Sequence, residues 1–203
     1  MSVMVSQAAL ARAVEHHQAG RLPQAEAGYR QVLSKQPGQP DALHLLAVLK
    51  LQQGRLPEGV RLARQAAKAA PEQPSFWNTL AAAEQATGDL AAAALAYLRA
   101  VRLAPTYVEA WNGLATVAQV QGDAAAEDAA LERVTSLQPA YAPAWGRRGI
   151  LAFLAGRATD AAEHLARAVA LAPHDVAART NLGAVQIHLE RYLEAEATLR
   201  QAL

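Results

Sequence analysis

A glycine and a proline recur through this chain at one fixed interval. The step is 34 residues in both series: Gly20, Gly54, Gly88, Gly122 and Gly156, then Pro37, Pro71, Pro105, Pro139 and Pro173. Each proline follows its glycine by 17 residues. A fixed period of this length predicts a stack of repeated units in which each unit contacts only its neighbours.

The residues between each glycine and the next proline have the spacing of a helix. In one unit a single helix face collects Leu90, Ala93, Ala94, Tyr97, Leu98 and Val101. A second helical stretch runs from each proline to the next glycine. Glycine takes the left-handed conformation that ends a helix, and proline cannot continue one. Each unit is therefore predicted as helix A, a glycine turn, helix B and a proline break, and no strand is expected.

Helix A carries a large ring followed by a small residue. Tryptophan stands at Trp77, Trp111 and Trp145, and four positions later come Ala81, Ala115 and Gly149. This pairing lets a ring fill the space between helices while the backbones approach closely, so we expect the three tryptophans in the core. The pattern resembles the tetratricopeptide repeat family, here read as Trp77, Leu80, Ala81, Gly88, Ala93, Tyr97, Ala100 and Pro105.

That resemblance implies an all-α fold, an α–α superhelix of about six 34-residue helix-turn-helix repeats. The single solenoid would fill residues 1–203, with repeats near 6–39, 40–73, 74–107, 108–141, 142–175 and an incomplete 176–203. Positions are numbered below from the first residue of each repeat. The sequence departs from the family pattern at four of them. Glu127 replaces a small residue, so helix B there is expected to shift and use Ala126; Arg148 replaces a leucine, Arg179 an aromatic residue, and Glu190 the turn glycine.

Composition excludes several classes of function. The net charge is +1, so no strong field would draw the chain to nucleic acid or to an anionic membrane. The longest apolar run, LAAAALAYL, is far shorter than the roughly 20 residues of a membrane span. The absence of cysteine fits a reducing compartment, and we expect a cytoplasmic location.

No catalytic or metal-binding motif is found in the sequence. The six histidines lack the spacing of a metal site, and no nucleophile elbow or phosphate-binding loop occurs. We therefore expect no cofactor and no catalysis in this segment. A basic stripe on one helix B is interpreted as a solvated face: Arg61, Arg64 and Lys68.

The resemblance implies that positions 2, 5, 6, 9, 12 and 13 of helix A line a concave groove. We expect nine polar side chains at these positions to line the peptide-binding groove: Asn78 and Asn112 at position 5, Arg147 and Asn181 at position 6, Gln85 and Gln119 at position 12, with His44, Glu109 and Thr116. Amides both donate and accept, which suits the backbone of an extended peptide. Arg147 adds a fork for a carboxylate. The alternative is that these amides bond only to neighbouring helices. Basic residues at positions 5 and 9, typical of chaperone-tail clamps, are missing.

The segment DALHLLAVL is similar to the opening repeats of bacterial proteins in which such repeats precede a catalytic domain. Two groups are considered: O-linked N-acetylglucosamine transferase-like enzymes, including those that glycosylate flagellin, and repeat-linked sulfotransferases. In the first group an asparagine ladder lines the superhelix, and here that ladder is partial. A free-standing adaptor is the alternative. The last helix B keeps an apolar stripe, Leu193, Ala197 and Leu199 to Leu203, so we expect further sequence, a partner or self-association to cover it.

Overall fold

The computed structural model describes the backbone of residues 2–201 and the side chains of residues 7–201. Over that range the chain forms twelve α-helices and no strand. They are α1 Ser2–Gln18, α2 Leu22–Lys35, α3 Pro40–Gln52, α4 Leu56–Ala69, α5 Pro74–Ala86, α6 Leu90–Leu103, α7 Val108–Gln121, α8 Ala124–Leu137, α9 Ala142–Leu154, α10 Ala158–Leu171, α11 Val176–His188 and α12 Tyr192–Arg200. Odd-numbered helices are the predicted helices A, and even-numbered ones the helices B. The predicted all-α chain of about six helix pairs is confirmed.

The turn inside each pair uses the left-handed backbone that the glycine period predicts. The φ angles of the five recurring glycines lie between 71° for Gly20 and 86° for Gly88. Glu190 takes the same conformation with φ 59°, the one non-glycine residue with positive φ in the described range. The turn geometry is thus kept where its preferred residue is lost, at a cost of roughly 1–2 kcal/mol.

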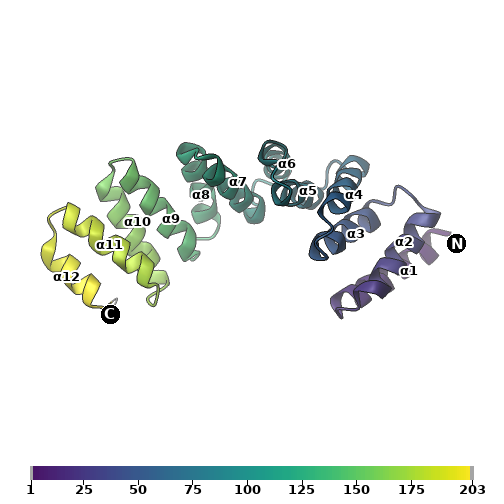
Figure 1. Cartoon of the computed structure of the whole chain (residues 1–203), viewed down its shortest axis with the longest axis horizontal. Helices are drawn as coiled ribbons and strands as arrows, with labels where there is room; N and C mark the ends of the chain where they lie inside the picture. The colour runs from purple at the N-terminus through teal and green to yellow at the C-terminus, as the bar shows by residue number, and fades with distance from the viewer. Residues whose placement is uncertain (1, 202–203) are drawn as a thin grey trace. The chain divides into compact units, whose positions relative to one another are not determined.

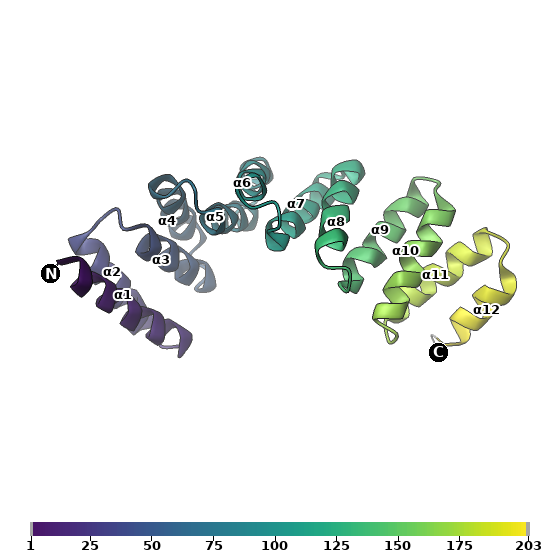
Figure 2. The same cartoon turned by 180° about the vertical axis from the view of Figure 1, so that it is seen from behind.

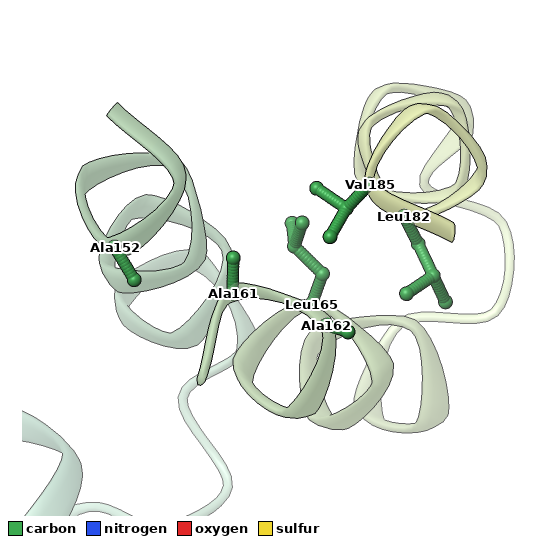
Figure 3. Close-up of a cluster of buried hydrophobic side chains, with 6 residues drawn as sticks. All are labelled: Ala152, Ala161, Ala162, Leu165, Leu182 and Val185. Carbon is green, nitrogen blue, oxygen red and sulfur yellow. The ribbon is translucent and has the colours of Figure 1, made fainter. Parts of the chain in front are cut away.

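Small residues bring the two helices of a pair together, as helices α9 and α10 illustrate (Figure 1). A Cβ atom added to Gly149 of α9 would lie 2.6 Å from Cγ of Leu165 on α10. Leu165 is fully buried and also reaches the next pair, where Leu182 and Val185 of α11 belong to the same cluster. Figure 3 shows Leu165 and Val185 pointing toward one another. One leucine therefore packs within its own repeat and against the next.

The tryptophans are not the core residues that the sequence predicted. Trp77, Trp111 and Trp145 are all half-buried. Each indole Nε1 donates to the carbonyl oxygen of the proline six residues earlier, at 2.8, 2.9 and 3.0 Å in chain order. The rings therefore tie helix A to the preceding turn, and the buried core is built mainly from alanine and leucine.

Helix α8 keeps the register of the other helices B. It begins at Ala124, which is 34 residues after the first residue of α6 and 34 before that of α10. Ala126 is exposed and Glu127 is buried, so the predicted shift that would use Ala126 is wrong. The helix stays in place because the buried carboxylate has a cationic partner, described below.

The chain divides into two compact units, unit 1 up to Gly113 and unit 2 from Leu114, and the division falls inside α7. Figure 2 gives the reverse view, in which each unit can be followed by its helix labels. Within each unit, successive pairs are joined by contacts between helix B and the next helix A, such as α2 with α3 and α10 with α11.

Candidate functional site

An open cavity lies between two helices A of unit 2, α9 and α11. Its volume is about 220 Å³. It is lined by Ala142, Pro143, Gly146, Arg147, Ile150, Leu165, Asp175, Ala177, Ala178 and Asn181. Two of the side chains predicted to line a groove, Arg147 and Asn181, are therefore brought together in one cavity.

Arg147 is held in place by a buried carboxylate that the sequence analysis did not assign to it. Its Nη2 donates to Oε2 of Glu127 at 2.9 Å, and its Nε donates to Oε1 of the same residue. The Glu127 side chain is 4% exposed and the Arg147 side chain 33%. The hydrogen bond from Arg147 to Glu127 raises the pKa of the guanidinium, and burial opposes this only in part.

This two-point pairing changes what Arg147 offers to a ligand. The charge of the guanidinium is largely compensated by the carboxylate, while its plane is fixed in one orientation. Nη1 makes no hydrogen bond within the described residues, so it is available as an oriented donor. The only other charged group lining the cavity is Asp175, whose Oδ1 accepts from the backbone N–H of Ala178 at 3.0 Å and caps α11. The cavity is therefore suited to a neutral acceptor rather than to a strongly acidic group.

Asn181 contributes a second, uncommitted polar group. Its side chain is half-buried, and its carboxamide forms no hydrogen bond within residues 7–201. An amide that can both donate and accept, lining the same cavity as Arg147, is an arrangement that a peptide backbone can satisfy. Pro143 and Ile150 provide apolar walls on the α9 side.

Exposed apolar side chains at the ends of the helices A in unit 2 were missed by the sequence analysis. They occupy positions 12 and 13, two of the positions that the family resemblance turns inward: Val120 at 64% exposure, Phe153 at 36%, Leu154 at 76% and Ile187 at 48%. The Phe153 and His188 rings meet edge to face, with centroids 5.3 Å apart. Polar residues were expected to bind a peptide at those positions, so the sequence pattern gave no reason to select the apolar ones.

In unit 1 the predicted groove residues are mostly engaged within the unit. His44 stacks on Phe76 with ring centroids 4.5 Å apart. Burial lowers the pKa of His44, although the charge of Asp41 acts in the opposite direction. Oε1 of Gln85 accepts a hydrogen bond from the Tyr97 hydroxyl at 3.0 Å.

The asparagines of unit 1 are also turned toward the protein. Nδ2 of Asn112 donates to the carbonyl oxygen of Val108 in its own helix at 3.2 Å. Oδ1 of Asn78 is buried and has no partner in the described range. The remaining predicted residues are exposed on α7: Glu109 in unit 1, Thr116 and Gln119 in unit 2.

Neither a metal site nor a membrane span is found in the residues that the structure describes. No group of three or more His, Cys, Asp or Glu side chains is arranged to hold a metal ion there. None of the helices in this range is long and apolar enough to cross a membrane.

Models of the tetratricopeptide repeat match nearly the whole chain. One model matches residues 16–83 and 152–203, more than half of the sequence, and two others match residues 74–117 and 112–176. No curated protein matches the sequence.

Several solved structures have a similar fold. PilF of Pseudomonas aeruginosa is 16% identical with a TM-score of 0.78, and the match covers 97% of this chain and 88% of that one. YrrB, described as a TPR protein with an unusual peptide-binding site, is 18% identical, with a TM-score of 0.73 and 90% of both chains covered. MamA from Desulfovibrio magneticus RS-1 is 18% identical, with a TM-score of 0.70, 80% of this chain and 92% of that one covered.

Proposed function

Because the chain belongs to the tetratricopeptide repeat family, we propose that it acts by binding an extended protein segment along the helices A of unit 2. The observation that carries the proposal is the cavity that Arg147 and Asn181 both line. YrrB, which is similar in fold, is described as having a peptide-binding site, and this supports a peptide as the class of ligand. The chain itself would bind rather than catalyse.

The proposed ligand has a neutral polar part and an apolar part. A backbone carbonyl would accept from Nη1 of Arg147, and a backbone amide group would pair with the carboxamide of Asn181. Apolar side chains of the ligand would cover Leu154 and Ile187, whose exposure in the free protein leaves apolar surface in water. The ligand needs no acidic residue, because Glu127 already forms an ion pair with Arg147 and compensates its charge.

A peptide library displayed on phage would test this proposal. Peptides selected on the wild-type chain would be measured by calorimetric titration against the variant Leu154→Ser/Ile187→Ser and against Asn181→Ala. We expect the double variant to lose binding at least tenfold and Asn181→Ala to lose a few-fold, about 1 kcal/mol for one hydrogen bond. The matched control is Leu95→Ser, because Leu95 is an equally exposed leucine, at 70%, on a helix B of unit 1.

The choice of variants matters at Arg147. Arg147→Glu would place a second carboxylate beside the buried Glu127, so a loss of binding could reflect a loss of structure. Substitutions of exposed residues avoid this. If the selected peptides bound Leu154→Ser/Ile187→Ser as tightly as the wild type and lost affinity for Leu95→Ser, the binding surface would lie on helices B instead.

A finer proposal concerns the protein to which these repeats belong. The similarity of DALHLLAVL to repeats that precede catalytic domains supports a role in recruiting a protein substrate, such as a flagellin, to a bacterial cytoplasmic glycosyltransferase or sulfotransferase. A free-standing adaptor is the alternative. The sequence of the gene beyond codon 203 separates them: a sugar-nucleotide-binding domain there supports the transferase, and a stop codon supports the adaptor.

A further inference from the structure

Helix α4 in unit 1 presents a row of cations on the face opposite its buried residues. The buried residues are Gly59, Leu62, Ala63, Ala66 and Ala67. Arg61, Arg64 and Lys68, which were interpreted from the sequence as a solvated face, are all exposed and follow one another at intervals of three and four residues. Such intervals place the three cations along one line of the helix surface, about one turn apart. We call Arg61, Arg64 and Lys68 the cationic row.

The cationic row borders an open cavity. Its volume is about 320 Å³, and Pro57, Val60 and Gln65 line it together with the row. Among the residues that the structure describes, no acidic side chain lines this cavity. An anionic group that entered it would therefore meet cations and no competing carboxylate.

Two members of the row have no anionic partner. Nη2 of Arg64 donates to Oε1 of Glu84 at 2.8 Å, and the Glu84 side chain is 6% exposed, so Arg64 compensates a buried charge. Nη1 of Arg61 donates to the neutral Oε1 of Gln65 at 3.4 Å. Neither Arg61 nor Lys68 forms an ion pair within residues 7–201. These two charges are therefore left for a partner outside the chain.

The row is a property of α4 and not of helices B in general. It occupies positions 22, 25 and 29 of its repeat. The residues at these three positions are Ala27, Arg30 and Ser34 in α2, Ala129, Glu132 and Ser136 in α8, and Glu163, Ala166 and Ala170 in α10. The repeat pattern therefore does not require cations at these positions, and a role in packing does not explain them.

The next helix B, α6, presents apolar side chains at two of the same positions. Both α4 and α6 pack against α5 (Figure 1). Leu95 and Leu98 of α6 stand at positions 22 and 25 and are 70% and 38% exposed. Covering exposed leucine side chains is favourable because it removes apolar surface from water. Two helices that flank the same helix A thus present cations on one and leucines on the other.

We propose that the helices B of unit 1 bind an acidic amphipathic helix of a partner protein, with its carboxylates paired to Arg61 and Lys68 and its apolar side chains on Leu95 and Leu98. Acidic residues on one face of a helix recur at the same intervals of three and four residues as the cationic row. Guanidinium and ammonium groups form strong hydrogen bonds with carboxylates. The exposed leucines favour a protein over a nucleic acid, because a phosphate backbone has no apolar surface to cover them.

This inference goes beyond the peptide binding proposed for unit 2. It involves α4 and α6 rather than the cavity between α9 and α11, and it requires an acidic ligand rather than a neutral one. The two proposals can therefore fail separately.

A designed peptide tests the proposal by fluorescence anisotropy. The peptide is stapled to be helical, with glutamates spaced by three and four residues on one stripe and leucines on the neighbouring stripe. We expect saturable binding to the wild type that weakens as salt is added. Arg61→Glu/Lys68→Glu should lower the affinity about tenfold or more, because it replaces attraction by repulsion. Leu95→Ser/Leu98→Ser should lower it several-fold, and circular dichroism checks that each variant is folded.

The matched control is Lys35→Glu/Arg167→Glu. It changes the net charge by the same amount at exposed cations of two other helices B, α2 and α10. This variant should bind the peptide like the wild type, and so should Leu154→Ser/Ile187→Ser, which alters only the surface proposed for unit 2.

Four results would overturn the proposal. They are the absence of saturable binding to the wild type, undiminished binding to Arg61→Glu/Lys68→Glu, equal affinity for a peptide of the same composition in scrambled order, and displacement of the peptide by a short DNA duplex at an equal or lower concentration. The third result would mean that charge alone is recognised. The fourth would mean that the cationic row binds phosphates rather than a protein helix.

Discussion

In unit 1 most of the polar residues predicted at the inner positions of helix A make contacts within the unit, whereas in unit 2 two of them line an open cavity. Gln85 accepts from the Tyr97 hydroxyl, and His44 is covered by Phe76. Arg147 and Asn181, in contrast, face a cavity of about 220 Å³. An inner position of helix A therefore does not by itself make a side chain available, because a residue of a neighbouring helix can cover it or bond to it.

One ion pair in each unit buries the opposite member. In the Lys50–Glu26 pair of unit 1 the cation is the buried partner, with Lys50 at 0% exposure and Glu26 at 20%. In the Glu127–Arg147 pair of unit 2 the anion is buried, with Glu127 at 4% and Arg147 at 33%. A buried charge left alone costs far more than one that water can reach.

The largest expected effect follows from this inversion. In unit 1, Glu26→Ala leaves the Lys50 ammonium with only a neutral acceptor, Gln53, at 3.2 Å, and should cost about 3–5 kcal/mol in the free energy of unfolding. Lys50→Ala should cost less, because Glu26 keeps Arg30 and water. In unit 2 the order reverses, so Arg147→Ala should be more damaging than Glu127→Ala. Urea unfolding would measure the free energy of unfolding of all four single variants, and hydrogen exchange would show in which unit the stability is lost.

A pair of double variants is the control for that prediction. Glu26→Leu/Lys50→Met and Glu127→Ala/Arg147→Ala remove both charges, so each should be less destabilising than the more damaging single change in its unit. If substitution of the acid were the more destabilising change in both pairs, or substitution of the base in both, burial would not be the deciding factor.

Two glycines allow a smaller test of the same contrast. Gly113 belongs to unit 1 and is at position 6 of the fourth repeat. A Cβ atom added to it would lie 2.2 Å from Cζ of the Tyr97 ring. Tyr97 is 5% exposed and cannot move aside, so Gly113→Ala should destabilise by about 1–3 kcal/mol. Gly146 in unit 2 has only Ala168 Cβ nearby, at 3.8 Å. Gly146→Ala should therefore stabilise by about 0.5–1 kcal/mol through helix propensity.

Thermal or urea unfolding of the two glycine variants measures this difference. Gly146 also lines the cavity, so Gly146→Ala should bind the selected peptides more weakly while being more stable. Equal stability changes for the two variants would mean that local packing around the glycine does not determine the outcome.

Most of the fold could be predicted from the sequence because its signals are local. The turns depend on single glycines, and even Glu190 adopts the predicted left-handed conformation. The candidate site depends on pairs of residues about 20 apart, such as Glu127 with Arg147 and Asp128 with Arg148. Comparison with the repeat pattern identifies single residues of these pairs as departures from the family, but it does not show that the two members of a pair form an ion pair. The tryptophans were misassigned for a similar reason, since a ring at a fixed position says nothing of where its N–H finds an acceptor.

The smallest expected effect concerns the dependence of stability on pH in unit 1. Burial lowers the pKa of His44 in the folded protein, so the neutral form is the one that the fold stabilises. Above about pH 6.5, the ordinary histidine pKa, both states are neutral and the stability is fully present. As the pH falls below that value the unfolded chain takes up a proton first, so the free energy of unfolding decreases until the folded pKa has been passed.

His44→Phe keeps a ring against Phe76 and removes the titration, so unit 1 of the variant should lose less stability on acidification. The stability of unit 2 should still depend on pH in the variant. Burial is the main cause that lowers the pKa of His164, and the charge of Arg148 lowers it further. Urea unfolding followed by hydrogen exchange over this pH range would measure the stability of each unit separately. If the stability of unit 1 depended on pH in the variant as it does in the wild type, His44 would not be the source of that dependence.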